Sequence, residues 1–213
     1  EKQKQEAWLV ASHLFNIILL SMLFLSVALA IFMDPLMRLI TPGFTPEMRE
    51  ATIPLARIML LSPILLGVSA LFSGVLQYFQ RFLVYALAPV LYNLGIIFGI
   101  VVLEPKMGLE GLAWGVIVGA LLHLAIQVYP TLKSGFHWHV GLGFGHPAMR
   151  QLLKLMAPRT LGAAAYHLNL TFVTAVASTL AAGSIAIFNF ASGLHFFPIA
   201  LIGVSLGVAV FPT

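Results

Sequence analysis

The residues of this sequence that can do chemistry are a small set of polar side chains within long apolar runs. Those in its last third are Arg159, His167, Asn189, Ser192 and His195. Polar groups are costly to bury in lipid, so those inside apolar runs are candidates for a functional site. A guanidinium can hold a phosphate through two parallel hydrogen bonds. One interpretation of Arg159 is therefore that it neutralises a phosphate of an anionic ligand. The alternative is that Arg159 reaches out to lipid headgroups.

The sequence gives little support for covalent catalysis or for a metal site. The nearest approach to a metal cluster is His137, His139 and His146 in a glycine-rich stretch, with no acid or cysteine to complete a zinc site. The chain has 0 cysteines, which excludes disulfides and thiol nucleophiles. Residues 111–213 also contain no Asp or Glu. We therefore predict no catalytic residue, no metal site and no cofactor, and interpret the histidine-containing stretch as a solvated loop.

The overall composition is that of a membrane protein. Hydrophobic residues make up 60% of the chain and charged residues only 8%, whereas soluble domains carry about a quarter charged residues. Helices satisfy their own backbone groups in lipid, which removes the need for a charged surface. The net charge of +4 comes from scattered single residues, so a nucleic-acid partner is not expected.

Runs of about 20 apolar residues, the length that spans a bilayer, divide the chain. The runs lie near 7–33, 53–76, 82–103, 111–132, 152–180 and 184–211. Breakers separate them, including Asp34-Pro35 with a loop over 36–50, a tight loop over 104–108 and a break at 181–184. We therefore predict an all-α polytopic membrane helix bundle with about six transmembrane helices.

The loop charges predict which way the chain crosses the membrane. With the N-terminus inside, the inner side carries Lys2, Lys4, Arg81, Lys133, Arg150, Lys154 and Arg159. The outer side carries Arg38, Arg49, Arg57 and Lys106. The basic excess is then cytoplasmic, as the positive-inside rule requires. Aromatic residues that fit the two membrane interfaces are Trp8, Tyr78, Tyr85, Trp114, Tyr129 and Trp138.

Other residues predict how the helices pack. Spaced glycines allow close backbone approach in lipid, and they occur as Gly95 with Gly99 and as Gly111, Gly115 and Gly119. Prolines that free a carbonyl group and allow a kink are Pro63, Pro89, Pro158 and Pro198. We interpret His13, Asn93 and His123 as residues that form hydrogen bonds between helices.

Several motifs in order carry a family resemblance. They are Ala56-Arg57-Ile58-Met59 to Ser62-Pro63, Gly74-Val75-Leu76-Gln77, Ala88-Pro89-Val90-Leu91-Tyr92-Asn93, Leu155-Met156-Ala157-Pro158-Arg159, and Pro198 through Gly203-Val204-Ser205 to Phe211-Pro212. On these residues the chain resembles the MurJ/MviN lipid II flippases of the MOP exporter superfamily. The resemblance covers essentially the whole chain, and it is the order and spacing of the motifs that make it specific.

The resemblance implies a two-lobed transporter of about fourteen helices in the bacterial inner membrane. It would move lipid II, an undecaprenyl-diphosphate-linked precursor of peptidoglycan, to the outer leaflet by alternating access. Residues 1–135 would be remaining helices of the N-terminal lobe, 136–150 a cytoplasmic inter-lobe loop and 151–213 the first two helices of the C-terminal lobe. We expect an internal fragment, because the chain starts at Glu1 and stops within an apolar run.

The sequence departs from this family at one point. Members often carry an Asp-Arg pair after an alanine in the eighth helix, where Ala191 is here followed by Ser192-Gly193. Arg159 or His195 would then supply the positive charge. Two alternatives stay open: a related MOP-type exporter of polysaccharide-lipid or drugs, and a membrane enzyme of polyprenyl phosphates. The expected partners are a lipid-linked anionic substrate and membrane lipids, and the residues indicate no oligomeric state.

Overall fold

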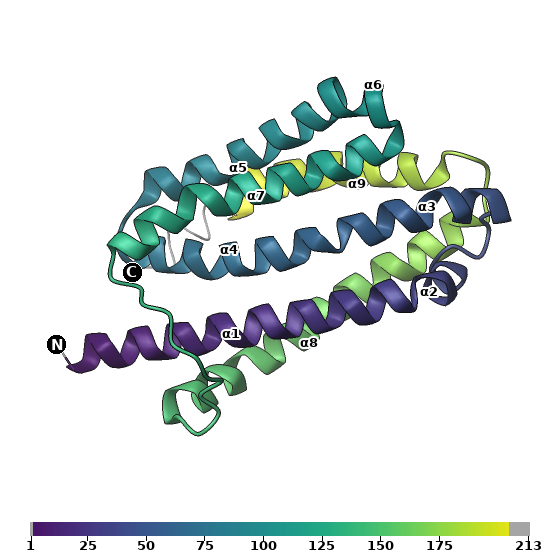
Figure 1. The fold of residues 1–213 in the computed structure, drawn as a ribbon. Helices are drawn as coiled ribbons and strands as arrows, with labels where there is room; N and C mark the ends of the chain where they lie inside the picture. Colours follow the sequence, from purple (N-terminus) through teal and green to yellow (C-terminus); the bar gives the residue numbers. More distant parts are fainter. Residues whose placement is uncertain (1, 205–213) are drawn as a thin grey trace.

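The computed structural model describes residues 2–204, and this part of the chain is a bundle of long helices (Figure 1). In chain order these are α1 (Lys2–Ile31), α2 (Met33–Ile40), α3 (Pro46–Met59), α4 (Leu61–Tyr78), α5 (Phe82–Phe98), the π-helix η1 (Gly99–Leu103), α6 (Glu104–Met107), α7 (Leu109–Lys133), α8 (Pro147–Ser178), α9 (Ser184–Pro198) and the π-helix η2 (Ile199–Val204). The end of the last predicted span, 205–211, lies outside the described residues.

Five helical stretches of the described chain are long and apolar enough to cross a membrane. They are Gln5–Ile31, Pro46–Tyr78, Phe82–Met107, Leu109–Lys133 and Ser184–Gly203. The prediction of an all-α polytopic membrane protein is confirmed. The predicted span near 152–180 corresponds to α8, which is 32 residues long but does not belong to this apolar group. The break predicted at 181–184 is also confirmed, since α8 ends at Ser178 and α9 begins at Ser184.

The predicted irregular loop over Leu36–Glu50 is wrong. α1 ends at Ile31, because Pro35 has no N–H to donate to the carbonyl of that residue. The chain resumes as α2, which contains both Asp34 and Pro35. Only a short turn then separates α2 from α3, whose N-terminus is capped by Thr45. The proline therefore marks a break between two helices rather than the start of a long loop.

A second proline break separates α3 from α4 and lies against α1. Pro63 cannot donate to the carbonyl of Met59, and the two helices are interrupted at Leu60. The Ser26 hydroxyl of α1 donates to the Leu60 carbonyl at 2.9 Å, which stabilises the break. Pro89, Pro158 and Pro198 lie within helices. The predicted tight loop at 104–108 contains the short helix α6.

The predicted glycine packing is confirmed between α7 and the helix that α5 and η1 form together. A Cβ atom built on Gly99 would lie 2.5 Å from the Cα of Gly115, and one on Gly95 would overlap the backbone of Gly119. Neither glycine can therefore carry a side chain at this separation. Contact this close increases the van der Waals attraction between the helices, which is a main driving force for helix association in lipid.

An aromatic cluster joins α1 and α4 to the segment that follows α7. Phe136, which comes just after α7, is buried with Phe72 of α4, and their ring centroids are 5.6 Å apart. Phe15 of α1 stacks on Phe72 at 6.0 Å, and Trp8 meets Phe136 edge-on at 6.1 Å. The first residues after α7 are thus held in the core, which fixes where the following segment begins.

Candidate functional site

The predicted binding residues lie on the hairpin formed by α8 and α9. The two helices run antiparallel from the turn at 179–183, and the rings of Tyr166 and Phe196 pack edge-to-face across them at 6.4 Å. His167 and His195 each adjoin this pair in sequence, so they lie at the same level of the hairpin. Arg159 precedes Tyr166 by seven residues, which is about 10 Å along a helix.

The polar side chains of the hairpin are open to their surroundings. Arg159, His167, Asn189 and His195 are exposed, and Ser192 is half-buried. Within residues 2–204 no carboxylate lies within ion-pair distance of Arg159. α8 also has no acidic residue in its first turn. A guanidinium in this setting keeps its full capacity to bind a carboxylate or phosphate from outside.

Asn189 lies apart from the other predicted binding residues. It lines a cavity of about 480 Å³ between the α2–α3 turn and the α8–α9 turn. The two turns that border this cavity lie at the end of the bundle opposite the start of α1 (Figure 1). The structure therefore groups Arg159, His167 and His195 along the hairpin, whereas Asn189 belongs to the contact at its turn.

A buried polar network joins α4 and α7. The Gln127 amide donates to the Ser69 hydroxyl at 2.8 Å and accepts from the Ser73 hydroxyl at 2.8 Å. The Ser69 oxygen lies 2.6 Å from Nδ1 of His123. The interpretation of His123 as a residue that bonds between helices is confirmed. Because Gln127 and Ser69 are fully buried, the network satisfies groups that lipid would leave unpaired.

Two other predicted interhelical bonds do not form within residues 2–204. The Asn93 amide donates at 2.8 Å to the Pro89 carbonyl of its own helix, α5, so the prediction for this residue is wrong. His13 has no hydrogen bond to another helix among the described residues, and its Nδ1 is buried without a partner there. The ring of His13 instead packs under Gly141 and Gly143, where a side chain would collide with it.

The stretch interpreted as a solvated loop has no helix or strand over residues 137–143, its His137 and His139 side chains are exposed, and it is also bound to α1. Asn16 donates to the carbonyls of His139 and Gly141, each at 2.8 Å, and accepts from the Trp138 indole at 2.7 Å. The Ser12 hydroxyl accepts from the backbone amide of His139 at 2.6 Å. Ser12 and Asn16 are four residues apart, so they lie on one face of α1. That spacing was the available sequence signal for this site.

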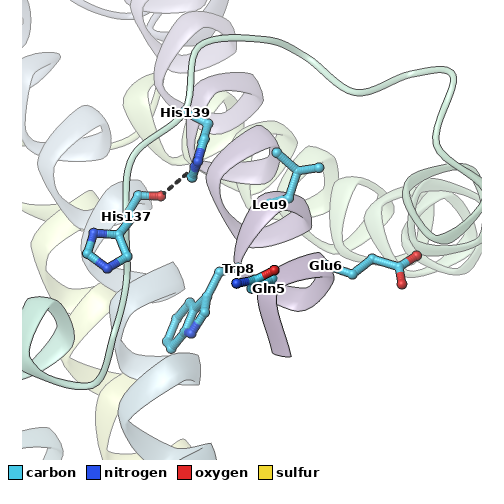
Figure 2. A pocket seen from close by; sticks show the side chains of 6 residues that line it. All are labelled: Gln5, Glu6, Trp8, Leu9, His137 and His139. Atoms are coloured by element: carbon cyan, nitrogen blue, oxygen red, sulfur yellow. Dashed lines mark hydrogen bonds between the residues drawn. The ribbon is translucent and has the colours of Figure 1, made fainter. Parts of the chain in front are cut away.

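The histidines of this stretch line an open cavity but do not converge. The cavity has a volume of about 530 Å³ and is lined by Gln5, Glu6, Trp8, Leu9, His137 and His139. Figure 2 shows the Glu6 side chain pointing away from both histidines, while Nδ1 of His139 lies 3.0 Å from the His137 carbonyl. His146 pairs with Glu6 at 3.2 Å. Within the described residues no three potential ligands meet in a geometry that can hold a metal ion.

Comparison with known proteins adds evidence of another kind. The family model described as lipid II flippase MurJ matches residues 1–213. The chain is 34% identical to the lipid II flippase MurJ of Burkholderia cenocepacia, over 76% of this chain and 32% of that protein. It is 32% identical to a probable lipid II flippase MurJ of Buchnera aphidicola, over 89% of this chain and 38% of that protein. The chain thus spans well under half the length of the relatives it matches.

Proposed function

This chain belongs to the lipid II flippase MurJ family, and on that premise we propose that the whole protein flips lipid II from the inner to the outer membrane leaflet. The family match over residues 1–213 is the observation that carries the proposal. Such a transporter moves its substrate without making or breaking covalent bonds. Binding side chains and mobile helices are therefore the parts it needs, and the protein is a transporter rather than an enzyme.

The charge of the substrate supports a role for the α8–α9 hairpin. Lipid II carries a diphosphate, and a desolvated diphosphate requires cations or oriented donors. Arg159 is exposed on α8, and no described carboxylate lies within ion-pair distance to neutralise it. His167 and His195 lie about two turns further along the hairpin. We infer that Arg159 makes the first phosphate contact and that the two histidines line the path beyond it, with Ser192 as a neutral hydrogen-bonding neighbour.

The polarity of α8 supports a position next to water or substrate. α8 is long enough to cross a membrane, but it is not among the five helical stretches that are also apolar enough to do so. A helix with His and Asn side chains at membrane depth is stable when these face a bundle interior or a wet cavity. In this proposal residues 1–135 belong to the N-terminal lobe and 151–213 to the C-terminal lobe. The two lobes would rock about a cavity that α8 lines, in the inner membrane of a bacterium.

The test uses the full-length protein reconstituted in vesicles with lipid II carrying a fluorescent label. We expect the labelled lipid to become accessible to a membrane-impermeant quencher faster than in protein-free vesicles. A polyprenyl-linked polysaccharide precursor and a cationic drug serve as alternative substrates. Transport of either alternative without transport of lipid II would overturn the proposal in favour of another exporter of the superfamily. The same protein should also restore growth of cells depleted of their lipid II flippase.

A further inference from the structure

The segment between α7 and α8 runs alongside α1, first away from the N-terminus of that helix and then back toward it. We call residues 136–146 the strap. Just before the strap, Gly135 lies against Trp8. The strap then bonds to Ser12 and Asn16 through His139 and Gly141. Its last residue, His146, returns to Glu6. Figure 1 shows this segment crossing α1 between the end of α7 and the start of α8.

Helix geometry gives the depth at which the strap lies in the membrane. Glu6 is the last charged residue before an uncharged run from Ala7 to Met33, so Glu6 and Trp8 mark the membrane interface. Asn16 lies ten residues beyond Glu6, which is about 15 Å along α1. The uncharged run is longer than the roughly 20 residues that cross the hydrocarbon, so its first turns lie among the headgroups. The middle of the strap, which is bonded to Ser12 and Asn16, therefore lies at the boundary between headgroups and acyl chains and a few Å inside it.

The backbone of the strap suits this depth. Irregular backbone is tolerated in a membrane only where its polar groups are bonded or lie next to water. The carbonyls of His139 and Gly141 receive the Asn16 amide at 2.8 Å, and the amide of His139 reaches the Ser12 oxygen at 2.6 Å. α1 thus supplies hydrogen bonds to the deepest part of the strap, where water is scarce.

The strap presents a row of apolar side chains away from the core. Alternate residues carry them, with relative exposures of 61% for Trp138, 81% for Val140, 36% for Leu142 and 54% for Phe144. The indole N–H of Trp138 is already bonded to Asn16 at 2.7 Å, which leaves its ring as the exposed part. Trp is enriched at membrane interfaces because one end of its side chain is apolar and the other polar.

The charges around the strap match a lipid surface. Lys133 precedes it, Arg150 and Lys154 follow it, and the chain has no Asp or Glu from residue 111 onward. Arg150 is also tied to the strap, since its Nε donates to the Phe144 carbonyl at 3.0 Å. Basic residues beside an apolar row attract anionic headgroups while the row enters the acyl boundary.

We propose that the strap is an interfacial membrane anchor. Its apolar row inserts at the headgroup–acyl boundary of the leaflet on the side of the α1 N-terminus, and Ser12 and Asn16 hold its backbone in place. The occupant of this surface is the lipid bilayer itself. The strap therefore fixes the link between α7 and α8 to the membrane surface instead of leaving it free in water.

The test places an environment-sensitive fluorophore on single cysteines in the full-length protein, made cysteine-free elsewhere and held in vesicles containing anionic lipid. Val140→Cys reports on the apolar row, and Phe144→Cys repeats the reading at its far end. Gly145→Cys is the matched control, because it is exposed and has no atom within 4 Å of a built Cβ. Each label is challenged with acyl-chain-brominated lipids and with aqueous iodide.

We expect blue-shifted emission and loss of intensity with brominated lipid at residues 140 and 144, and quenching by iodide at residue 145. Equal iodide quenching at all three positions would overturn the proposal, because the strap would then be a solvated loop. Resistance of residues 140 and 144 to both quenchers would also overturn it, because another part of the protein would then cover the row. Adding Asn16→Ala should move the residue 140 label toward the iodide-quenched state.

Discussion

The backbone amide of Gly43 donates a 3.1 Å hydrogen bond to the hydroxyl of Ser178, which is 135 residues away in sequence. This bond joins the α2–α3 turn to the last residue of α8. A Cβ atom on Gly43 would overlap the Ser178 carbonyl, so the contact is backbone to backbone. It closes one end of the bundle beside the cavity that Asn189 lines.

Gly43→Ala should therefore weaken this end of the bundle. Overpacking of a close contact costs about 1–3 kcal/mol, and we expect a lower thermal midpoint for the purified full-length protein. Gly162→Ala on α8 is the control, since its built Cβ meets no atom within 4 Å. That variant should be neutral or slightly stabilised because alanine favours helix. An unchanged midpoint for Gly43→Ala would mean that the turn separates from α8 without cost.

Gln127→Leu should destabilise the pairing of α4 with α7. The substitution removes the bond from Gln127 to Ser69 and leaves the half-buried Ser73 hydroxyl without its partner. A buried polar group that loses its partner costs about 1–3 kcal/mol. Asn93→Leu is the control, because that amide is exposed and bonds only within α5. We expect denaturant unfolding in detergent to separate the two variants. Combining Ser69→Ala with Gln127→Leu should cost less than the sum of the single changes, and strict additivity would argue against a shared network.

Arg159→Ala should abolish complementation of flippase-depleted cells while the protein still reaches normal membrane levels. A phosphate contact loses both its charge and its paired hydrogen bonds in this variant. Arg159→Lys should keep part of the activity, since the charge remains but the planar fork does not. Growth rate and immunoblot of the membrane fraction are the two measurements. Full growth with Arg159→Ala would reduce the residue to a side chain that reaches the headgroups.

The loop charges predict that Gly145 faces the cytoplasm and Lys106 the opposite side. Both residues are exposed, so a cysteine at either position should react readily with thiol reagents. In intact cells, a membrane-impermeant reagent should label Lys106→Cys and leave Gly145→Cys unlabelled until the cells are opened. The reverse pattern would show that the chain crosses the membrane in the other direction.

The sequence by itself determined the fold class and most of the helices. Apolar runs of spanning length and a charged fraction of 8% leave helices in lipid as the stable solution, because backbone groups must be satisfied within each segment. The spaced glycines over residues 95–119 also predicted close backbone packing, although only the structure shows which helices they bring together. Helix ends near prolines were harder to predict, since Pro35 interrupts one helix and also lies in the first turn of the next.

Only the tertiary structure decided which polar groups meet. His13, Asn93 and His123 look alike as single polar residues in apolar runs, yet one packs under glycines, one bonds its own helix and one joins a network. The strap is the clearest case. Its glycines and histidines have the composition of a solvated loop. That composition does not show that the strap bonds to Ser12 and Asn16, which lie more than 120 residues earlier in the chain. Local composition carries no information about partners so distant, because their approach depends on how all the intervening helices pack.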